Sequence, residues 1–127
     1  MQVSVDLVEY SSARRALDTF NLIKNAVLFS AHKENPELYT FSSKKLMQTI
    51  AKTSKEINDL LLVGHNPAIE EIVDDLALKE HNLKDLKLLR EKYPTGAIAF
   101  MELNISCWSD VTENSGRLIK FVRPIDL

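Results

Sequence analysis

The 127-residue chain has a single cysteine, Cys107, and no apolar run that approaches the length of a membrane span. One cysteine cannot form an internal disulfide, so the sequence favours a reducing, cytoplasmic setting. The N-terminus also lacks the charged-then-apolar pattern of a secretory signal. With a net charge of −2, the chain has no basic surplus of the kind that general nucleic-acid binders show. We therefore expect no nucleic-acid partner and no membrane contact.

Further absences exclude classes of chemistry. The only glycines are Gly64, Gly96 and Gly116, and the sequence contains no Gly-rich phosphate loop. It shows no metal-ligand spacing of histidine, cysteine or acidic residues, and no Ser-His-Asp order. We therefore expect neither a metal nor a cofactor.

What is present is the composition of a soluble globular domain, 45% hydrophobic and 27% charged, in a chain able to bury a real core. Alternating and β-rich segments predict strands, and apolar stripes at helical spacing predict helices. The predicted strands are Val3–Tyr10, a short run at Ala26–Ala31, Leu60–Val63, Ala97–Ile105 and Arg117–Val122. The predicted helices are Ala13–Asn25, Ser42–Thr53, Pro67–Leu78 and one that starts near Leu83 and ends before Tyr93. Loops are expected at His32–Thr40 and Ser109–Gly116, and turns at His81–Asn82 and Thr95–Gly96.

The alternation of strands and helices predicts a sheet that is parallel at first. The last two strands are joined by a loop alone, so we expect them to be antiparallel neighbours. The whole chain, residues 1–127, is expected to form one domain.

The sequence from Leu60 to Glu71 is the most informative stretch. Four apolar residues, Leu60–Val63, predict a short strand that is buried on both faces. Gly64 allows a turn, His65 follows the strand, and Asn66 and Pro67 suit the N-cap and first position of a helix. A helix N-terminus behind a strand is a common anion site. A single histidine at such a turn is also often structural, and the spacing alone leaves both interpretations open.

Two arginines, Arg14 and Arg15, lie in the first turn of the predicted helix after Ser11 and Ser12, which are candidate caps. Cations there oppose the helix dipole. Either both extend into solvent, or at least one faces a bound phosphate.

Parallel pairing of the strands Val3–Tyr10 and Leu60–Val63 would place the residues that follow them at one sheet edge. The carboxyl edge is where α/β sheets bind ligands. Ser11, Arg15, His65 and Asn66 would then meet there, which predicts a phosphate pocket between two helix N-termini.

At these residues the sequence resembles the histidine phosphatase superfamily, which includes the phosphoglycerate mutases, and most of all the SixA-type phosphohistidine phosphatases. Leu61–Pro67 with Glu70 and Glu71 resembles the segment that carries that family's second catalytic histidine. Asp6–Thr19 resembles its strand-to-helix segment, in which an arginine precedes a threonine by four residues, so Arg15 takes that role. Later segments follow in the family's order: Glu37–Tyr39, Tyr93–Ala99, Trp108, Phe121–Pro124 and Asp126–Leu127.

One departure concerns the nucleophile. The family opens with a strand that ends in Arg-His-Gly, and that histidine attacks phosphorus; this chain contains no such triplet. His32 and His81 lack a matching context, and we interpret both as surface residues. Ser12 stands where the family often has proline.

The resemblance implies a three-layer α/β/α sandwich with a mostly parallel sheet, of which the first family strand is missing, a cytoplasmic location and no metal. It implies hydrolysis of phosphohistidine or a phosphomonoester, with Arg15 and His65 stabilising the transferring oxygens. Ser11 and Asn66 would line the substrate site, and Glu37 is a possible acid, although a solvated loop residue is the better interpretation.

We therefore expect an N-terminally incomplete phosphohistidine phosphatase with little or no activity. The alternatives are a non-catalytic module that binds phosphate or phosphohistidine, and half of a split phosphatase. Removal of an interior strand would expose unpaired edges on its two neighbours. We accordingly expect an unstable monomer, or one that recruits a strand from another chain through these edges.

Overall fold

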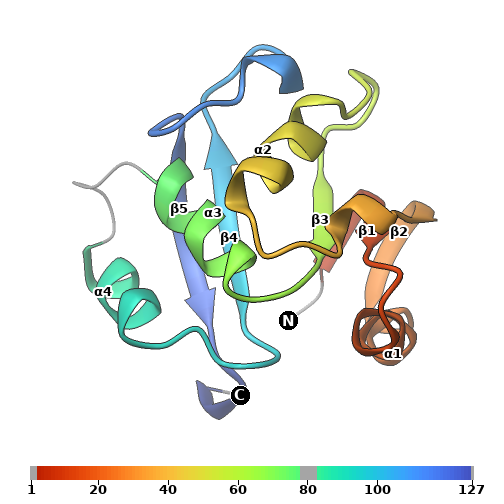
Figure 1. The fold of residues 1–127 in the computed structure, drawn as a ribbon, viewed down its shortest axis with the longest axis horizontal. Helices are drawn as coiled ribbons and strands as arrows, with labels where there is room; N and C mark the ends of the chain where they lie inside the picture. Colours follow the sequence, from red (N-terminus) through yellow and green to blue (C-terminus); the bar gives the residue numbers. More distant parts are fainter. Residues whose placement is uncertain (1–2, 78–82, 127) are drawn as a thin grey trace.

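The computed structural model describes residues 3–77 and 83–126, which form an α/β fold (Figure 1). Its strands are β1 (Val3–Tyr10), β2 (Val27–Glu34), β3 (Leu60–Val63), β4 (Ile98–Leu103) and β5 (Gly116–Val122). Its α-helices are α1 (Arg14–Ile23), α2 (Ser43–Ala51), α3 (Ala68–Leu76) and α4 (Leu83–Glu91). Short 3-10 turns lie at Pro36–Leu38, Trp108–Asp110 and Pro124–Asp126. The predicted order of strands and helices is confirmed.

The strands form two sheets. One has the order β2-β1-β3, and β1 pairs in parallel with both of its neighbours. The other is the antiparallel pair β4-β5, with a register shift between Phe100 and Met101. Both predicted directions, parallel first and antiparallel last, are confirmed. Figure 1 shows the strands in the spatial order β5, β4, β3, β1, β2, so that β3 and β4 are the facing edges of the two sheets.

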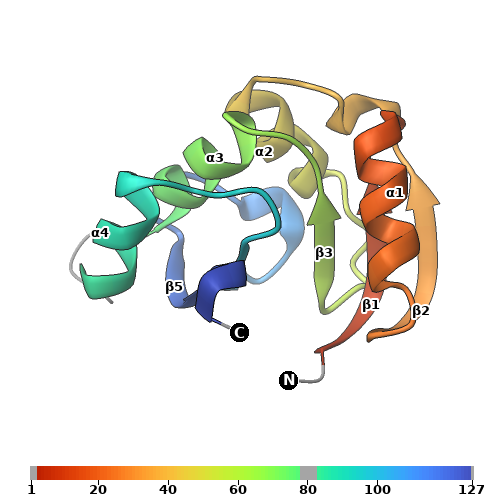
Figure 2. The ribbon, with the colours of Figure 1, turned by 90° about the horizontal axis from the view of Figure 1, so that it is seen from below.

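The side chains of β3 alternate between two helical layers, as a pleated strand requires. Leu61 and Val63 pack with Val8, Tyr10 and Phe20, beneath α1, which lies against β1 and β3 (Figure 2). Leu62 points the other way and packs against the buried cluster that α2 and α3 supply. The three-layer α/β/α arrangement is therefore confirmed.

The larger core joins the two sheets. Its buried members include Leu46 on α2, Ile72 on α3 and Leu118 on β5. Leu62 of β3 and Met101 of β4 both pack against this same cluster. The two sheets thus rest on one layer of helices, although in the part of the chain that the structure describes β3 pairs only with β1, and β4 only with β5.

Two predictions about strands are wrong. All four residues of β3 are half-buried rather than buried on both faces, because one edge of this strand has no neighbouring strand among the described residues. The strand β2 continues through Glu34, into the segment predicted as a loop, because it follows β1 in register as far as the pair Tyr10 and Glu34. The loop then forms a 3-10 turn at Pro36–Leu38.

The helix starts also differ from prediction. The N-cap of α1 is Ala13, while the Ser11 hydroxyl accepts a hydrogen bond from the Ala13 N–H at 3.2 Å. Pro67, after a cis peptide bond with Asn66, is the N-cap of α3 rather than its first residue. Asn66 still serves this end, since its Oδ1 accepts from the Glu70 N–H at 3.3 Å.

Near the end of the chain the turn at Thr95–Gly96 is confirmed, with a φ of 83° at Gly96 that glycine adopts without strain. The helix α4, which precedes this turn in the sequence, ends at Glu91 and so before Tyr93, as predicted. The turn predicted at His81–Asn82 lies outside the described residues, as do Leu78 and the surface position expected for His81.

Candidate functional site

Ser11 and His65 meet where β1 and β3 end. The Ser11 N–H donates to the Val63 carbonyl at 3.0 Å, which ties the two strand ends together. Immediately beyond them, His65 Nε2 lies 2.9 Å from Ser11 Oγ. Parallel pairing of β1 and β3 produces this approach, because the residues that follow the two strands lie at the same sheet edge.

Ser11 is fully buried, and its hydroxyl has two partners. The oxygen accepts from the Ala13 N–H and lies within hydrogen-bond distance of His65 Nε2, which accepts the hydroxyl hydrogen or donates its own according to the tautomer. The hydroxyl therefore fixes how the imidazole ring is oriented. The structure gives Ser11 a role as the support of His65, and its direct contact with a ligand stays a prediction.

Burial lowers the pKa of His65 below its ordinary value of 6.5, and the positive charge of Arg15 lowers it further. The imidazole is therefore mostly neutral at pH 7. The charge of Arg15, in the first turn of α1, reaches the site at the strand ends. Its neighbour Arg14 is different, because its Nε lies 3.7 Å from the Asp18 carboxylate on an exposed face of α1.

Tyr39 lies beside the site, and the sequence alone assigns it no role. Its ring centroid lies 5.1 Å from that of His65, with the ring planes tilted by 35°. It directly follows the 3-10 turn, and 59% of it is exposed. A tyrosine in a polar loop was the available signal, but only the tertiary structure shows which residue its ring faces.

The predicted acid, Glu37, lies in the same 3-10 turn and is exposed. Its Oε2 atom is 3.6 Å from Nζ of Lys52, at the end of α2. This exposed ion pair agrees with the interpretation of Glu37 as a solvated residue, and its role as an acid stays a prediction.

The side chain of Asn66 connects two segments beside the site. Its Nδ2 donates to the Tyr93 carbonyl at 2.9 Å, and its Oδ1 accepts from the first turn of α3. Asn66 thereby joins the start of α3 to the chain that follows α4. Its contact with a substrate stays a prediction.

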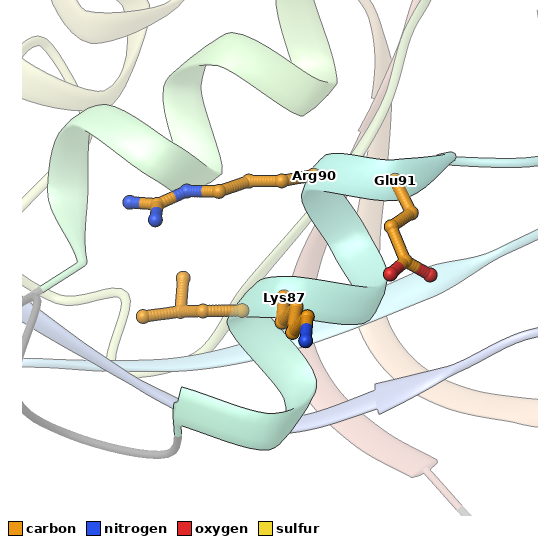
Figure 3. A pocket seen from close by; sticks show the side chains of 4 residues that line it. Lys87, Arg90 and Glu91 are labelled. Atoms are coloured by element: carbon orange, nitrogen blue, oxygen red, sulfur yellow. The ribbon is translucent and has the colours of Figure 1, made fainter.

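A hollow elsewhere on the surface contains none of the predicted site residues. It lies on α4 and is lined by Leu86, Lys87, Arg90 and Glu91 (Figure 3). Arg90 uses its Nε in a 2.8 Å salt bridge with Asp74 on α3. This hollow is therefore separate from the site at the ends of β1 and β3.

Two further observations concern residues 3–77 and 83–126. No group of three or more histidine, cysteine or acidic side chains in these ranges is arranged to hold a metal ion. None of the helices described there combines the length and the apolar character needed to cross a membrane.

Comparison with known proteins gives similarity at the level of structure. No protein-family model and no curated protein sequence matches the chain. One similar solved structure is that of a candidate phosphohistidine phosphatase SixA from Nakamurella multipartitia. The match covers 95% of this chain and 72% of the chain in that structure, with 21% sequence identity and a TM-score of 0.78. A second similar structure is that of a candidate phosphohistidine phosphatase SixA from Agrobacterium tumefaciens. The match covers 94% of this chain and 68% of the chain in that structure, with 25% sequence identity and a TM-score of 0.70. With its parallel β2-β1-β3 sheet and its helices on two faces, this chain has the SixA-type histidine phosphatase fold.

Proposed function

We propose that the site at the ends of β1 and β3 binds a phosphoryl group, carried by a phosphohistidine protein or a small phosphomonoester. The observation that carries this proposal is the grouping of Ser11, His65 and the charge of Arg15 at one sheet edge. The names of the two solved neighbours support phosphohistidine as the substrate class. We further propose that residues 1–127 act as one domain of the histidine phosphatase superfamily, in the cytoplasm and without a metal.

Each of these residues has a distinct part in binding. The guanidinium of Arg15 is always charged, and its planar set of donors matches the oxygens of a phosphate. The N-terminus of α1, where Arg15 lies, adds its own preference for negative charge. A phosphoryl dianion beside His65 would favour the imidazolium form and so raise the pKa of His65, opposing the effects of burial and Arg15.

We propose that this chain alone has little or no hydrolytic activity. In the family the phosphoryl group passes to a histidine nucleophile and then to water. The sequence contains no Arg-His-Gly triplet to supply that nucleophile. His65 is held by Ser11 and lies next to a cationic side chain, an arrangement that suits the stabilisation of charge on transferring oxygens.

The test measures binding of inorganic phosphate by NMR and calorimetry. It compares the wild-type chain with Arg15→Ala, His65→Ala and Arg14→Ala. Loss of a hydrogen bond to a charged group predicts that the first two variants bind about tenfold or more weakly. Arg14→Ala is the matched control, since Arg14 pairs with Asp18, and it should bind within about twofold of the wild type. Binding should also raise the pKa of the His65 imidazole.

A phosphohistidine peptide, incubated with the same proteins, tests the absence of turnover. Release of phosphate by the wild type above the rate without protein would refute the absence of turnover, and a covalent phosphohistidine trapped at position 65 would show that His65 attacks phosphorus. Equal losses in Arg14→Ala and Arg15→Ala would show that the anion lies elsewhere. No phosphate binding by the wild type would refute the proposed site.

A second candidate, half of a split phosphatase, is favoured by the two facing edges. The strands β3 and β4 belong to separate sheets, yet both pack on the cluster beneath α2 and α3. A strand from another polypeptide could pair with both edges and carry a nucleophilic histidine to the end of β3. Addition of a peptide that contains an apolar strand followed by Arg-His-Gly should then confer phosphatase activity. A confirmed monomer with a sharp, concentration-independent unfolding transition, and no response to the peptide, would refute this candidate.

A further inference from the structure

We propose that Tyr39 forms a stacking wall beside His65 that favours a phosphoryl group carried on a flat ring, the imidazole of a protein phosphohistidine, over free phosphate and aliphatic phosphoesters. This inference rests on the proposed phosphate site and deepens it, because it names the residue that would recognise the group bearing the phosphate. It follows from the position of the Tyr39 ring, the way its backbone is held and the chemistry of the surface it forms.

The exposure of Tyr39 contrasts with that of its neighbour. Leu38 is 0% exposed and packs in the larger core, whereas Tyr39 is 59% exposed. The Leu38 N–H donates to the Asn35 carbonyl, and the Tyr39 N–H to the Pro36 carbonyl, each at 3.1 Å. The Tyr39 ring is therefore exposed to solvent, while the backbone that carries it is fixed by the buried Leu38 side chain and by the hydrogen bonds of the turn.

A buried polar pair fixes the same turn to the central sheet. Asn35 Nδ2 donates to Glu9 Oε1 on β1 at 3.0 Å, and both residues are buried. Asn35 Oδ1 accepts from the Glu37 N–H at 3.0 Å, and the Asn35 N–H donates to the Tyr10 carbonyl at 2.8 Å. Burial of polar groups is costly unless they are paired, and here the pairing holds the turn that carries Tyr39.

The surface that results has the chemistry of a ring-binding site. The Tyr39 ring lies 5.1 Å from His65 and leaves more than half of the residue in contact with solvent. Aromatic rings attract other flat rings in offset or tilted geometry, beyond the effect of buried area. Phe41, two residues further along, is also 67% exposed, so the loop before α2 is rich in aromatic surface. A phosphoryl group at Arg15 and His65 would thus leave its imidazole carrier beside an exposed ring.

The test compares three ligands on the full chain: a peptide with a stable phosphonate analogue of phosphohistidine, a phosphoserine peptide and inorganic phosphate. Tyr39→Ala should weaken binding of the phosphohistidine analogue by about five- to tenfold. It should leave binding of phosphoserine peptide and of phosphate within about twofold. Tyr39→Phe, which keeps the ring, should restore the preference, and NMR spectra of each variant show whether the fold is intact.

The outcomes separate this inference from the function on which it rests. Intact phosphate binding with an unchanged preference in Tyr39→Ala would overturn the role of Tyr39 alone. Equal weakening of all three ligands would also overturn it, because Tyr39 would then shape the phosphate site rather than the site of the ring. No phosphate binding by the wild type would overturn the proposed function and this inference with it.

Discussion

Replacement of Asn35 by alanine tests how the turn beneath Tyr39 is held. Asn35 is 9% exposed, and its side chain both donates to the Glu9 carboxylate and accepts from the Glu37 N–H. Alanine removes both hydrogen bonds and leaves Glu9, which is 4% exposed, with a long 3.9 Å contact to the exposed Lys33 ammonium. The variant should therefore be markedly less stable.

The magnitude follows from the two hydrogen bonds. A hydrogen bond to a charged group contributes about 1.5–3 kcal/mol, and a side-chain cap about 1 kcal/mol. Together they predict that Asn35→Ala lowers the free energy of unfolding by about 3 kcal/mol. That loss is a large fraction of the stability of an ordinary domain.

Urea unfolding, followed by circular dichroism, measures the effect as a shift of the midpoint. Asn104→Ala is the matched control, because Asn104 is exposed and donates to the Ser115 carbonyl through its backbone N–H, which alanine keeps. In a Glu9→Gln background the cost of Asn35→Ala should fall, because the residue left unpaired is then neutral. A cost below about 1 kcal/mol, or an equal cost in both backgrounds, would refute the assigned role of the Glu9–Asn35 pair.

Two other substitutions test the packing and the electrostatics. Gly116→Ala should destabilise the chain by about 1–3 kcal/mol in urea unfolding, because a Cβ there would lie 2.8 Å from Leu103 Cδ2; an unchanged midpoint would show that β4 and β5 adjust freely. The lowered pKa of His65 means that the unfolded chain binds more protons, so stability should fall as pH decreases through the window between 6.5 and the folded pKa. Arg15→Gln should raise the pKa of His65 towards 6.5 without reaching it, since burial remains, and NMR titration of the ring that gives the wild-type pKa would contradict this coupling.

The sequence predicts much of the fold because local patterns determine much of it. Hydrophobic patterns identify each strand and helix to within a few residues, and an apolar strand followed by Gly64 and His65 indicates where the site lies. The meeting of Ser11 and His65 follows from one further step, that two parallel strands end at the same edge.

Other features depend on which segments become neighbours, and no local pattern encodes that. The half-burial of β3 follows from the edge that no strand of the described residues covers, and the length of β2 follows from its register with β1. The tilted contact between the Tyr39 and His65 rings joins residues 26 positions apart, through a turn that a buried Glu9 holds. From sequence, a buried acidic residue in a strand could not be distinguished from an exposed one on the alternate face.

The division of the strands between two sheets has a mechanical consequence. Among the described residues the ladder hydrogen bonds run within each sheet, while side-chain bonds such as Trp108 Nε1 to the Ile57 carbonyl, at 2.7 Å, connect the segments beside them. Side chains and the shared helix layer, rather than ladder hydrogen bonds, therefore set the position of β4 and β5 relative to β3. The packing of the helix layer, rather than the hydrogen-bond ladders of the strands, therefore holds the two sheets together.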